Sequence, residues 1–520
     1  MLPIRKLPIG IQDFEKLRTG NNVYVDKTAY IYQLASIDSP YFLARPRRFG
    51  KSLFLSTLKA YFLGKKELFE GLAVAELEKD WIEYPVFHID MNVGIITDSA
   101  SLVRRLGVIL DDLEKLWGRA VEDNDPASRF LGLISRAYEQ TGRKVVVLVD
   151  EYDKPLLGTM DDLNVNKDIR DVLKGFYGVL KSADAYLRFV LLTGVTKFSK
   201  VSVFSDLNHL VDISLDKEYA AICGISESEL VSCFQQEITA LAKEIGKTYD
   251  ETLAELKKRY DGYHFAKESE GMYNPFSLLN TLSKKDFSNY WFATGTPTFL
   301  VKMLKKLDFD VKTLEGGVRI SADSITDYRA EFEDPVPLLY QSGYLTILSY
   351  NDRFNSYTLG FPNEEVKYGF FNELLPAYVP GKNVRSEFYV GCFIEDLLAN
   401  NVDSFMTRLS AFFAGVPYDL NNKEEKHYQT IFFIFFRLMG QFIEVEQHSA
   451  VGRADAVVVT DDTVFAFEFK LSENATAEDA VKQIDEKGYL KPYAAANKKL
   501  VKVGVEFSKQ ERGINCWKVA

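Results

Sequence analysis

The stretch Phe42-Leu-Ala-Arg-Pro-Arg-Arg-Phe-Gly-Lys-Ser-Leu53 follows an apolar run and leads into a helical pattern. Phosphate-binding loops of the form G-x-x-x-x-G-K-[ST] have this position between a strand and a helix. Backbone N–H groups at the start of such a helix point toward an anion, and the helix dipole favours negative charge there. The stretch therefore predicts a phosphate site at the edge of an α/β domain.

The residues of this loop are the expected contacts of a nucleotide. Lys51 would reach the β- and γ-phosphates, and Ser52 would bind Mg²⁺. Gly50 would allow the close backbone approach that a side chain blocks. Arg45 stands at the first glycine position, so the loop alone leaves a solvated basic turn as an equal alternative. The predicted nucleotide contacts are Arg47, Arg48, Phe49, Gly50, Lys51, Ser52 and Leu53.

A second motif favours the nucleotide site. Residues 143–153 read Arg-Lys-Val-Val-Val-Leu-Val-Asp-Glu-Tyr-Asp, an apolar run that ends in two acids. Fully apolar strands are typical of parallel sheets covered on both faces, and ligands bind at the carboxyl ends of such strands. Asp150 would hold Mg²⁺, often through water, and Glu151 would polarise the attacking water. A helix cap is the alternative for this pair, and Lys51 and Ser52 upstream favour ATP binding.

Other polar residues near this edge have weaker predictions. Thr193 and Thr196 lie at the end of the next apolar run, and one of them would sense the γ-phosphate, with turn or capping chemistry slightly favoured for both. Arg47 and Arg48 would contact phosphates or, in a homo-oligomer, serve another protomer as arginine fingers. Solvent-facing loop charge is the alternative for both arginines.

The order of strand-like and helical patterns predicts an α/β protein with several domains. The strands expected in the first region are residues 41–44, 86–90, 145–149 and 188–193, with helices at 52–62 and 100–116. The strands expected near the C-terminus are residues 442–446, 454–460, 463–471 and 500–507, with a helix at 477–488. The predicted domains are a P-loop ATPase domain with a parallel sheet (1–215), a helical lid (216–285), a middle region (286–382) and a C-terminal α/β domain (383–520).

The middle region has a helix followed by a hairpin pattern. A helix ending near residue 343 precedes predicted strands at 344–349 and 357–361, which a polar turn joins. This order is typical of a winged helix, and a plain packing subdomain is an equal alternative.

The C-terminal domain brings acids and a lysine onto neighbouring predicted strands. Side chains alternate along a strand, so Glu468 and Lys470 share one face, and Asp455 on the preceding strand would meet them. The two carboxylates would bind Mg²⁺, and the lysine would orient or deprotonate water. Gln483 on the following helix would contact this site, and Glu425 on an upstream helix would add a third carboxylate. A structural ion pair between Glu468 and Lys470 is the alternative to a catalytic site.

Composition and charge set further limits on the function. The 520 residues are 47% hydrophobic and 26% charged, as in globular proteins. The four cysteines form no CxxC pair and no metal-ligand spacing, so a cytoplasmic protein without zinc is expected. The N-terminus lacks the apolar core of a signal peptide, and the longest apolar stretch, residues 430–439, is too short to span a membrane. The net charge of −11 argues against a nucleic-acid coat protein but not against a nucleic-acid enzyme.

These motifs give the chain a resemblance that covers nearly all of its length. The chain resembles the bacterial AAA-ATPase-like proteins that carry a C-terminal PD-(D/E)xK nuclease superfamily domain, whose fold is like that of restriction endonucleases. The stretches that carry the resemblance are Leu7-Pro-Ile-Gly10, Tyr24-Val-Asp-Lys-Thr28, Arg45-Pro-Arg-Arg-Phe-Gly-Lys-Ser52, Val149-Asp-Glu-Tyr-Asp153, Thr193-Gly-Val-Thr-Lys-Phe-Ser-Lys200, Tyr260-Asp-Gly-Tyr263, Asn289-Tyr-Trp-Phe-Ala-Thr-Gly-Thr-Pro297, Gly452-Arg-Ala-Asp455 and Phe467-Glu-Phe-Lys470.

The resemblance implies roles for individual residues. It makes Lys51, Ser52, Asp150 and Glu151 the ATPase residues, and Arg45 then departs from the general loop pattern but not from this family's own. It makes Asp455, Glu468, Lys470 and Gln483 the nuclease-type set, with Glu425 as a further member. Ala454 replaces the proline that names the PD motif, and many superfamily members vary there.

Two functions follow from these expectations. The first is an ATP-gated, Mg²⁺-dependent nuclease that acts on DNA. The second is a nucleotide-switch or regulatory protein whose nuclease-like domain only binds nucleic acid or a partner. The intact carboxylates and lysine count against the second, because a binding domain has no need to bury such a cluster.

Overall fold

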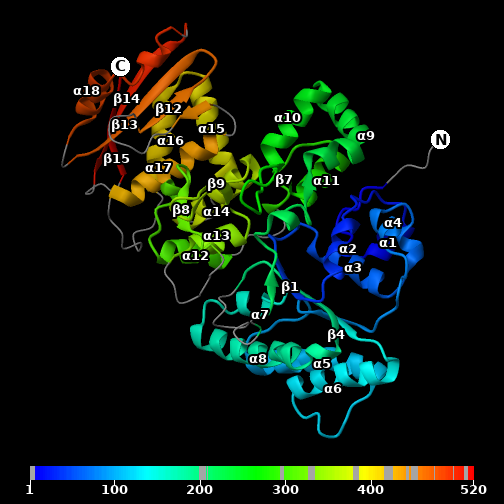
Figure 1. The fold of residues 1–520 in the computed structure, drawn as a ribbon. Helices are drawn as coiled ribbons and strands as arrows, with labels where there is room; N and C mark the ends of the chain where they lie inside the picture. Colours follow the sequence, from blue (N-terminus) through cyan, green and yellow to red (C-terminus); the bar gives the residue numbers. More distant parts are fainter. Residues whose placement is uncertain are drawn as a thin grey trace. The chain divides into compact units, whose positions relative to one another are not determined.

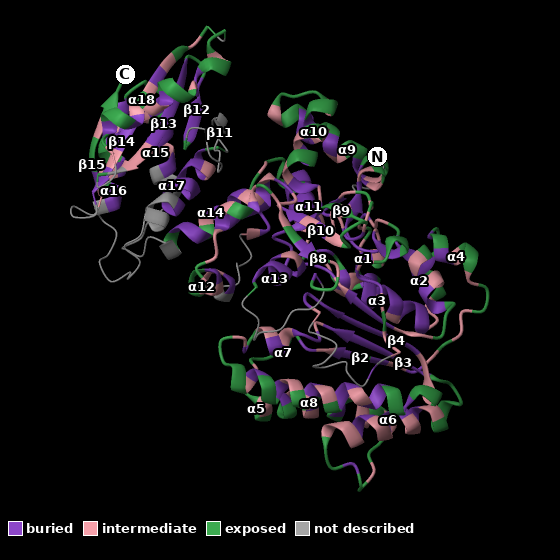
Figure 2. Cartoon of the chain, turned by 60° about the vertical axis from the view of Figure 1, so that its left-hand side comes forward, coloured by how far each residue is buried: buried purple, intermediate pink, exposed green. Residues whose placement is uncertain are grey.

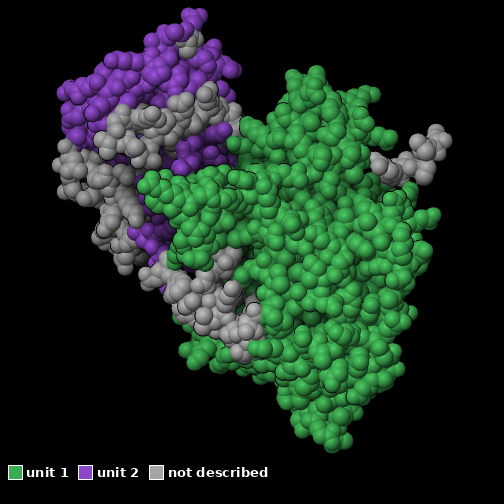
Figure 3. Space-filling model, in the orientation of Figure 1, with its two compact units in different colours: residues 1–295, 317–365 green, residues 296–316, 366–520 purple. Residues whose placement is uncertain are grey.

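In the computed structural model, the chain forms two compact units (Figure 3). Unit 1 comprises residues 1–295 and 317–365, and unit 2 comprises residues 296–316 and 366–520. The residues whose structure is described are 6–197, 207, 209–292, 298–325, 334–378, 386–414, 425–440, 444–446, 455–472, 475–495, 497–508 and 513–520. Among the described helices, none has the length and apolar character that a membrane crossing requires.

Unit 1 is built on a parallel sheet, as the apolar runs predict. Its described strands are β1 (Pro40–Ala44), β2 (Val86–Asp90), β3 (Val145–Asp150), β4 (Leu187–Gly194) and β5 (Val211–Asp212). They lie in the order β2-β3-β4-β1-β5 and pair in parallel throughout. All residues of β3 are buried, in agreement with its continuous apolar sequence. The order places β4 between the strand that precedes the predicted phosphate loop and the strand that ends at Asp150.

Helices cover both faces of this sheet (Figure 1, Figure 2). On one face α3 (Lys51–Phe62) packs against β3 and β2. On the other lie α5 (Ser99–Trp117), α6 (Pro126–Thr141) and α8 (Leu163–Ser182), which also pack against one another. The remaining α-helices described before β5 are α1 (Phe14–Thr19), α2 (Thr28–Ala35), α4 (Ala73–Leu77) and α7 (Lys154–Leu157).

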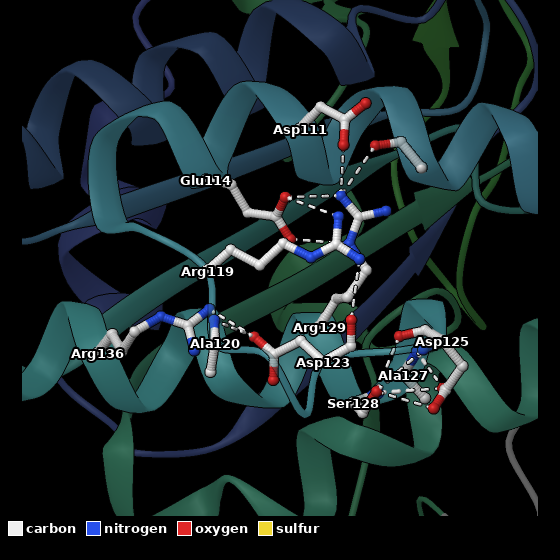
Figure 4. Close-up of polar contacts among 11 residues, drawn as sticks. Asp111, Glu114, Arg119, Ala120, Asp123, Asp125, Ala127, Ser128, Arg129 and Arg136 are labelled. Atoms are coloured by element: carbon white, nitrogen blue, oxygen red, sulfur yellow. Dashed lines mark hydrogen bonds and ion pairs between the residues drawn. The ribbon is translucent and has the colours of Figure 1, made fainter.

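An ion-pair cluster joins α5 to α6 (Figure 4). The Arg129 guanidinium donates to the Glu114 carboxylate through Nε at 2.7 Å and Nη2 at 2.8 Å, and Nη2 also reaches Asp111 at 2.5 Å. The side chains of Arg129 and Glu114 are each 9% exposed. A carboxylate so far removed from water depends on its cation, because an unpaired buried charge is costly.

Replacing Arg129 with methionine should therefore lower the free energy of unfolding of unit 1 by about 3 kcal/mol, because the buried Glu114 carboxylate loses both hydrogen bonds from the guanidinium and retains the longer contact with Arg119 at 3.8 Å. Urea denaturation followed by circular dichroism measures the loss. Arg104→Met, at an exposed position of α5, is the matched control and should change the stability by less than about 0.5 kcal/mol. Equal losses of unfolding free energy in the two variants would show that the ion pair between Arg129 and Glu114 does not stabilise unit 1.

The predicted lid is helical, and its first cap forms as the serine-rich start suggests. Ser226 accepts from the Glu229 N–H, while the Glu229 carboxylate accepts from the Ser226 N–H, so both residues cap α9. The helices of this part are α9 (Glu227–Ile245), α10 (Tyr249–Tyr260) and α11 (Pro275–Lys284), with a short pairing of β6 (Ile225–Ser226) and β7 (Met272–Tyr273).

The middle region contains the predicted helix and hairpin, with an added strand. The helix α13 (Val336–Gln341) precedes β9 (Thr346–Asn351) and β10 (Ser356–Gly360), which pair antiparallel, and β8 (Val318–Ser321) pairs with the far side of β10. The two hairpin strands lie one to two residues away from their predicted positions. The third strand has no strong pattern in the sequence.

Unit 2 contains a mixed sheet with helices on both faces. Its described strands are β11 (Glu444–Glu446), β12 (Ala456–Val459), β13 (Thr463–Leu471), β14 (Lys499–Ser508) and β15 (Gly513–Val519), in that order across the sheet. Its helices are α12 (Thr298–Lys306), most of α14 (Glu364–Tyr378), α15 (Ser386–Leu398), α16 (Val402–Ala414), α17 (Glu425–Met439) and α18 (Ala477–Lys487).

The predicted alternation along β13 is confirmed by its packing. The rings of Phe467 and Phe469 lie against Phe436 and Phe432 of α17, with centroids 5.3 and 4.2 Å apart. The opposite face packs against α18, where Ala466 shares a buried cluster with Ile484. The polar residues Glu468 and Lys470 therefore lie on the face that α18 covers.

Candidate functional site

The predicted phosphate loop lies at the carboxyl end of β1, directly before α3. Gly50 has a φ of 95°, in the left-handed region that favours glycine. A Cβ at this residue would have no atom within 4 Å, so the loop is open at the start of α3. Ser52 lies half-buried in the first turn of this helix. An anion at this point would face the free N–H groups of the helix.

Lys51 is held inside the loop. Its side chain is buried, and Nζ donates to the carbonyl oxygens of Arg45 at 2.9 Å and Pro46 at 3.1 Å. Burial lowers the pKa of this ammonium, while the nearby carboxylates of Glu151 and Asp150 favour its charged form. Phosphate oxygens could replace these carbonyl oxygens as acceptors of the hydrogen bonds from the Lys51 ammonium.

The predicted metal and water-activating acids lie at the end of β3. Asp150 is 6% exposed, and its Oδ1 accepts from the Thr193 hydroxyl of β4 at 2.8 Å. Thr193 thus reaches the acid from the strand between β1 and β3. Glu151 has a φ of 51°, and burial raises the pKa of its carboxyl. The structure brings these three residues and Lys51 to one edge of the sheet.

Asp153 is a further acid at this edge, and its role is not predicted from the sequence. Its Oδ2 accepts from the backbone N–H groups of Val195 at 3.0 Å and Thr196 at 2.6 Å, and from the Thr196 hydroxyl at 2.7 Å. The residue is 1% exposed, and burial raises its pKa. Thr196 therefore has the turn role that was the alternative, because its hydroxyl is committed to Asp153. The one feature of the sequence that points to Asp153 is its place as the third acid in the run Asp150-Glu-Tyr-Asp153.

The arginines and the phenylalanine of the loop have separate surroundings. Arg45 is 1% exposed and donates to the carbonyl oxygens of Ser214 at 2.8 Å and Tyr219 at 2.9 Å. Arg47 and Arg48 are exposed, and the Arg48 guanidinium lies 4.6 Å from the centroid of the Phe276 ring. The Phe49 side chain is buried against Tyr263 and Phe265, and Phe49 also lines the cavity beside the loop.

A cavity of about 100 Å³ adjoins the loop. A single water needs about 10–15 Å³ of such space, so the cavity has room for a larger group. Gly50 and Leu53 line it, and Lys27 lies at its wall in an ion pair with Glu229 of α9 at 2.6 Å. The other wall residues are mainly apolar, among them Val25, Ile222, Ile225 and Leu279. This lining of apolar residues with one charged side chain is typical of small-molecule sites.

In unit 2 the predicted acids and lysine come together beside α18. Glu468 is 3% exposed, and its Oε1 accepts from Lys470 Nζ at 3.0 Å and from Gln483 Nε2. Gln483 also donates to the Tyr489 hydroxyl at 3.2 Å. Burial raises the pKa of the Glu468 carboxyl to about 7, and the charge of Asp455 adds to this shift.

Two observations bear on a divalent metal at this cluster. Glu468 Oε2 is buried and has no hydrogen-bond partner within the described residues. Asp455 lies next to it, because its Oδ2 accepts from the Phe469 N–H at 2.9 Å. A cation would satisfy the buried oxygen, and oxygen ligands of this kind suit Mg²⁺.

The predicted third carboxylate stays a prediction. Glu425 is the first residue of α17, and its side chain lies outside the described residues. Among the side chains that the structure does describe, no group of three or more His, Cys, Asp or Glu could hold a metal ion.

Comparison with known proteins matches both parts of the chain. Residues 8–204 match a family described as "Predicted AAA-ATPase", and residues 423–517 match one described as "PD-(D/E)XK nuclease superfamily". The chain is 39% identical over 524 residues to a protein of Azotobacter chroococcum mcd 1 described as "Uncharacterized protein in vnfD 5'region", and the match covers 98% of each chain. The two family matches span the loop at Lys51 and the cluster at Glu468.

Proposed function

The chain belongs to the family of AAA-ATPase-like proteins with a C-terminal PD-(D/E)XK nuclease superfamily domain, and on this basis we propose that it is an ATP-gated, Mg²⁺-dependent DNA nuclease. The observation that carries the proposal is the buried Glu468 Oε2, which has no hydrogen-bond partner within the described residues. Asp455, Lys470 and Gln483 lie next to this carboxylate. Buried carboxylate oxygens usually have a hydrogen-bond partner or bind an ion, and a bound cation would account for this one.

The nucleotide half of the proposal rests on the loop and on the cavity beside it. The triphosphate would lie at the start of α3, where Gly50 leaves space, and Lys51 would exchange its carbonyl partners for phosphate oxygens. The nucleobase would occupy the cavity lined by Leu53. Ser52 and Asp150 would hold Mg²⁺, and Glu151 would orient the attacking water.

The nuclease half assigns one task to each residue of the cluster. Asp455 and Glu468 would hold Mg²⁺, and Gln483 would fix the Glu468 carboxylate from α18. The Lys470 ammonium would orient the attacking water and stabilise the charge that develops on the phosphate. Bound Mg²⁺ would supply further stabilisation of that charge.

The gating part of the proposal rests on contacts that the loop and the cavity wall make with the lid. Arg48 stacks on Phe276 of α11, and Lys27 pairs with Glu229 of α9 at the cavity wall. A nucleotide in the loop and cavity would touch both contacts, so its binding would favour one arrangement of the lid over another. Substrate cleavage would respond to that arrangement.

Cleavage of supercoiled plasmid and of single-stranded DNA tests the proposal. With Mg²⁺, ATP should raise the cleavage rate at least about tenfold over protein without nucleotide, which corresponds to an activation free energy lower by about 1.4 kcal/mol. A non-hydrolysable analogue separates binding from turnover, and chelation of Mg²⁺ should stop cleavage.

Two outcomes would contradict the proposal. Equal cleavage with and without ATP would leave two independent domains. Tight DNA binding without cleavage in any condition would instead favour a nucleotide-switch regulator whose nuclease-like domain only binds nucleic acid.

A further inference from the structure

The stretch Asn289-Tyr-Trp291 has no part in either proposed reaction, yet Trp291 contacts the phosphate loop directly. Its side chain is 8% exposed, and the indole Nε1 donates to the carbonyl oxygen of Arg47 at 3.3 Å. The ring lies against Tyr344, with centroids 5.3 Å apart. Arg47 follows Pro46, whose carbonyl oxygen accepts from Lys51. Trp291 thus holds the same backbone segment that Lys51 holds.

The turn at Gly343 closes this contact from the other side. Gly343 has a φ of 89°, and a Cβ there would lie 2.6 Å from the Pro46 Cβ and 3.6 Å from Trp291 Cζ2. Only glycine permits this backbone conformation and this approach to Pro46 without a shift of the loop or the turn. The loop at Pro46 and Arg47 is therefore in close contact with both the indole and the turn.

The backbone N–H of Trp291 links the residue to the buried carboxylate of Glu365. Its N–H donates to Glu365 Oε1 at 2.9 Å, and the Ser277 hydroxyl of the lid donates to the same oxygen at 2.9 Å. Glu365 is 2% exposed and lies in the first turn of α14. Unit 1 ends at Glu365, and the chain continues along α14 into unit 2.

We propose that Trp291 senses the state of the phosphate loop and transmits it to Glu365 and the first turn of α14. This inference rests on the proposed ATP binding. When Lys51 leaves the carbonyls of Arg45 and Pro46 for phosphate oxygens, the loop segment loses two of its hydrogen bonds and settles in a new position. The indole follows the Arg47 carbonyl, and the Trp291 N–H shifts the Glu365 carboxylate with it.

Fluorine NMR of 5-fluorotryptophan-labelled protein tests the first step without altering the fold. The chain has four tryptophans, and Trp291→Phe identifies the resonance of Trp291. Mg²⁺-ATP should shift this resonance in the wild-type protein and leave it unchanged in Lys51→Ala. If ATP binds, as calorimetry shows directly, but the Trp291 resonance stays in place, the inference is wrong and the proposed function stands.

Hydrogen exchange of the first turns of α14 tests the second step. Wild-type protein should show an ATP-dependent change in exchange at residues 366–370. Trp291→Phe keeps a ring but loses the indole donor, so it should lose this change while ATP affinity falls by less than about tenfold. Glu365→Gln keeps an oxygen for the Trp291 N–H and should keep the change.

The matched control is Trp517→Phe, which removes an indole donor to Asp403 in unit 2 and should leave the response intact. An unaltered exchange response in Trp291→Phe would refute the relay. Failure of the wild-type protein to bind ATP would refute the proposed function, and the relay with it.

Discussion

Replacing Lys51 with alanine is expected to reduce ATP turnover at least about 100-fold, the effect of removing one preorganised charge from a transition state. The ammonium is buried beside Glu151, Asp150 and the carbonyls of the loop, and its removal would leave these acceptors and the triphosphate without their cation. Release of inorganic phosphate measures turnover, and calorimetry measures ATP affinity. DNA cleavage should fall to the level seen without nucleotide.

Lys59→Ala is the matched control for this change. Lys59 lies on the same helix, α3, but eight residues from the loop and near the helix end. Its loss should leave turnover and ATP affinity close to the wild-type values. Comparable losses in the two variants would mean that general damage to α3, and not the loop cation, explains the effect.

Replacing Lys470 with alanine should reduce DNA cleavage by about 100-fold or more while ATP turnover persists. The variant removes the ammonium that lies 3.0 Å from Glu468 and would stabilise the developing phosphate charge. Gel analysis of plasmid cleavage and phosphate release from ATP, measured on the same preparation, separate the two activities.

Lys502→Ala is the control for this second change. Lys502 lies on the neighbouring strand β14 and pairs with Asp485 at 2.6 Å, outside the cluster. Cleavage by this variant should match the wild type. If cleavage persists unchanged in Lys470→Ala, the nuclease activity belongs to a contaminant and the proposed role of Lys470 is wrong.

The sequence predicts the elements of unit 1 well because local patterns determine them. The apolar run before Asp150 and the helix after Gly50 appear within a residue or so of their predicted limits. The order of the strands could not be read in this way. That order depends on which strands pair across long separations in sequence, and it is what brings Thr193 to Asp150.

The candidate sites were predictable as residue types but not as contacts. The alternation along β13 predicts the shared face of Glu468 and Lys470, since strand geometry fixes it. The roles of Asp153 and Trp291 depend on tertiary contacts with Thr196 and Arg47 that no spacing encodes. The same holds for Glu365, which lies 74 residues from Trp291 in the chain.

Arg45 has a consequence for the thermodynamics of nucleotide binding. A loop rich in glycine is conformationally free until a phosphate orders it, and the lost entropy weakens the complex. Here the guanidinium binds the carbonyls of Ser214 and Tyr219 and stacks on Phe265 at 4.3 Å, so this part of the loop is ordered when the protein folds. The entropy lost on ordering this part of the loop then lowers the free energy of unfolding, and it does not weaken the binding of a nucleotide.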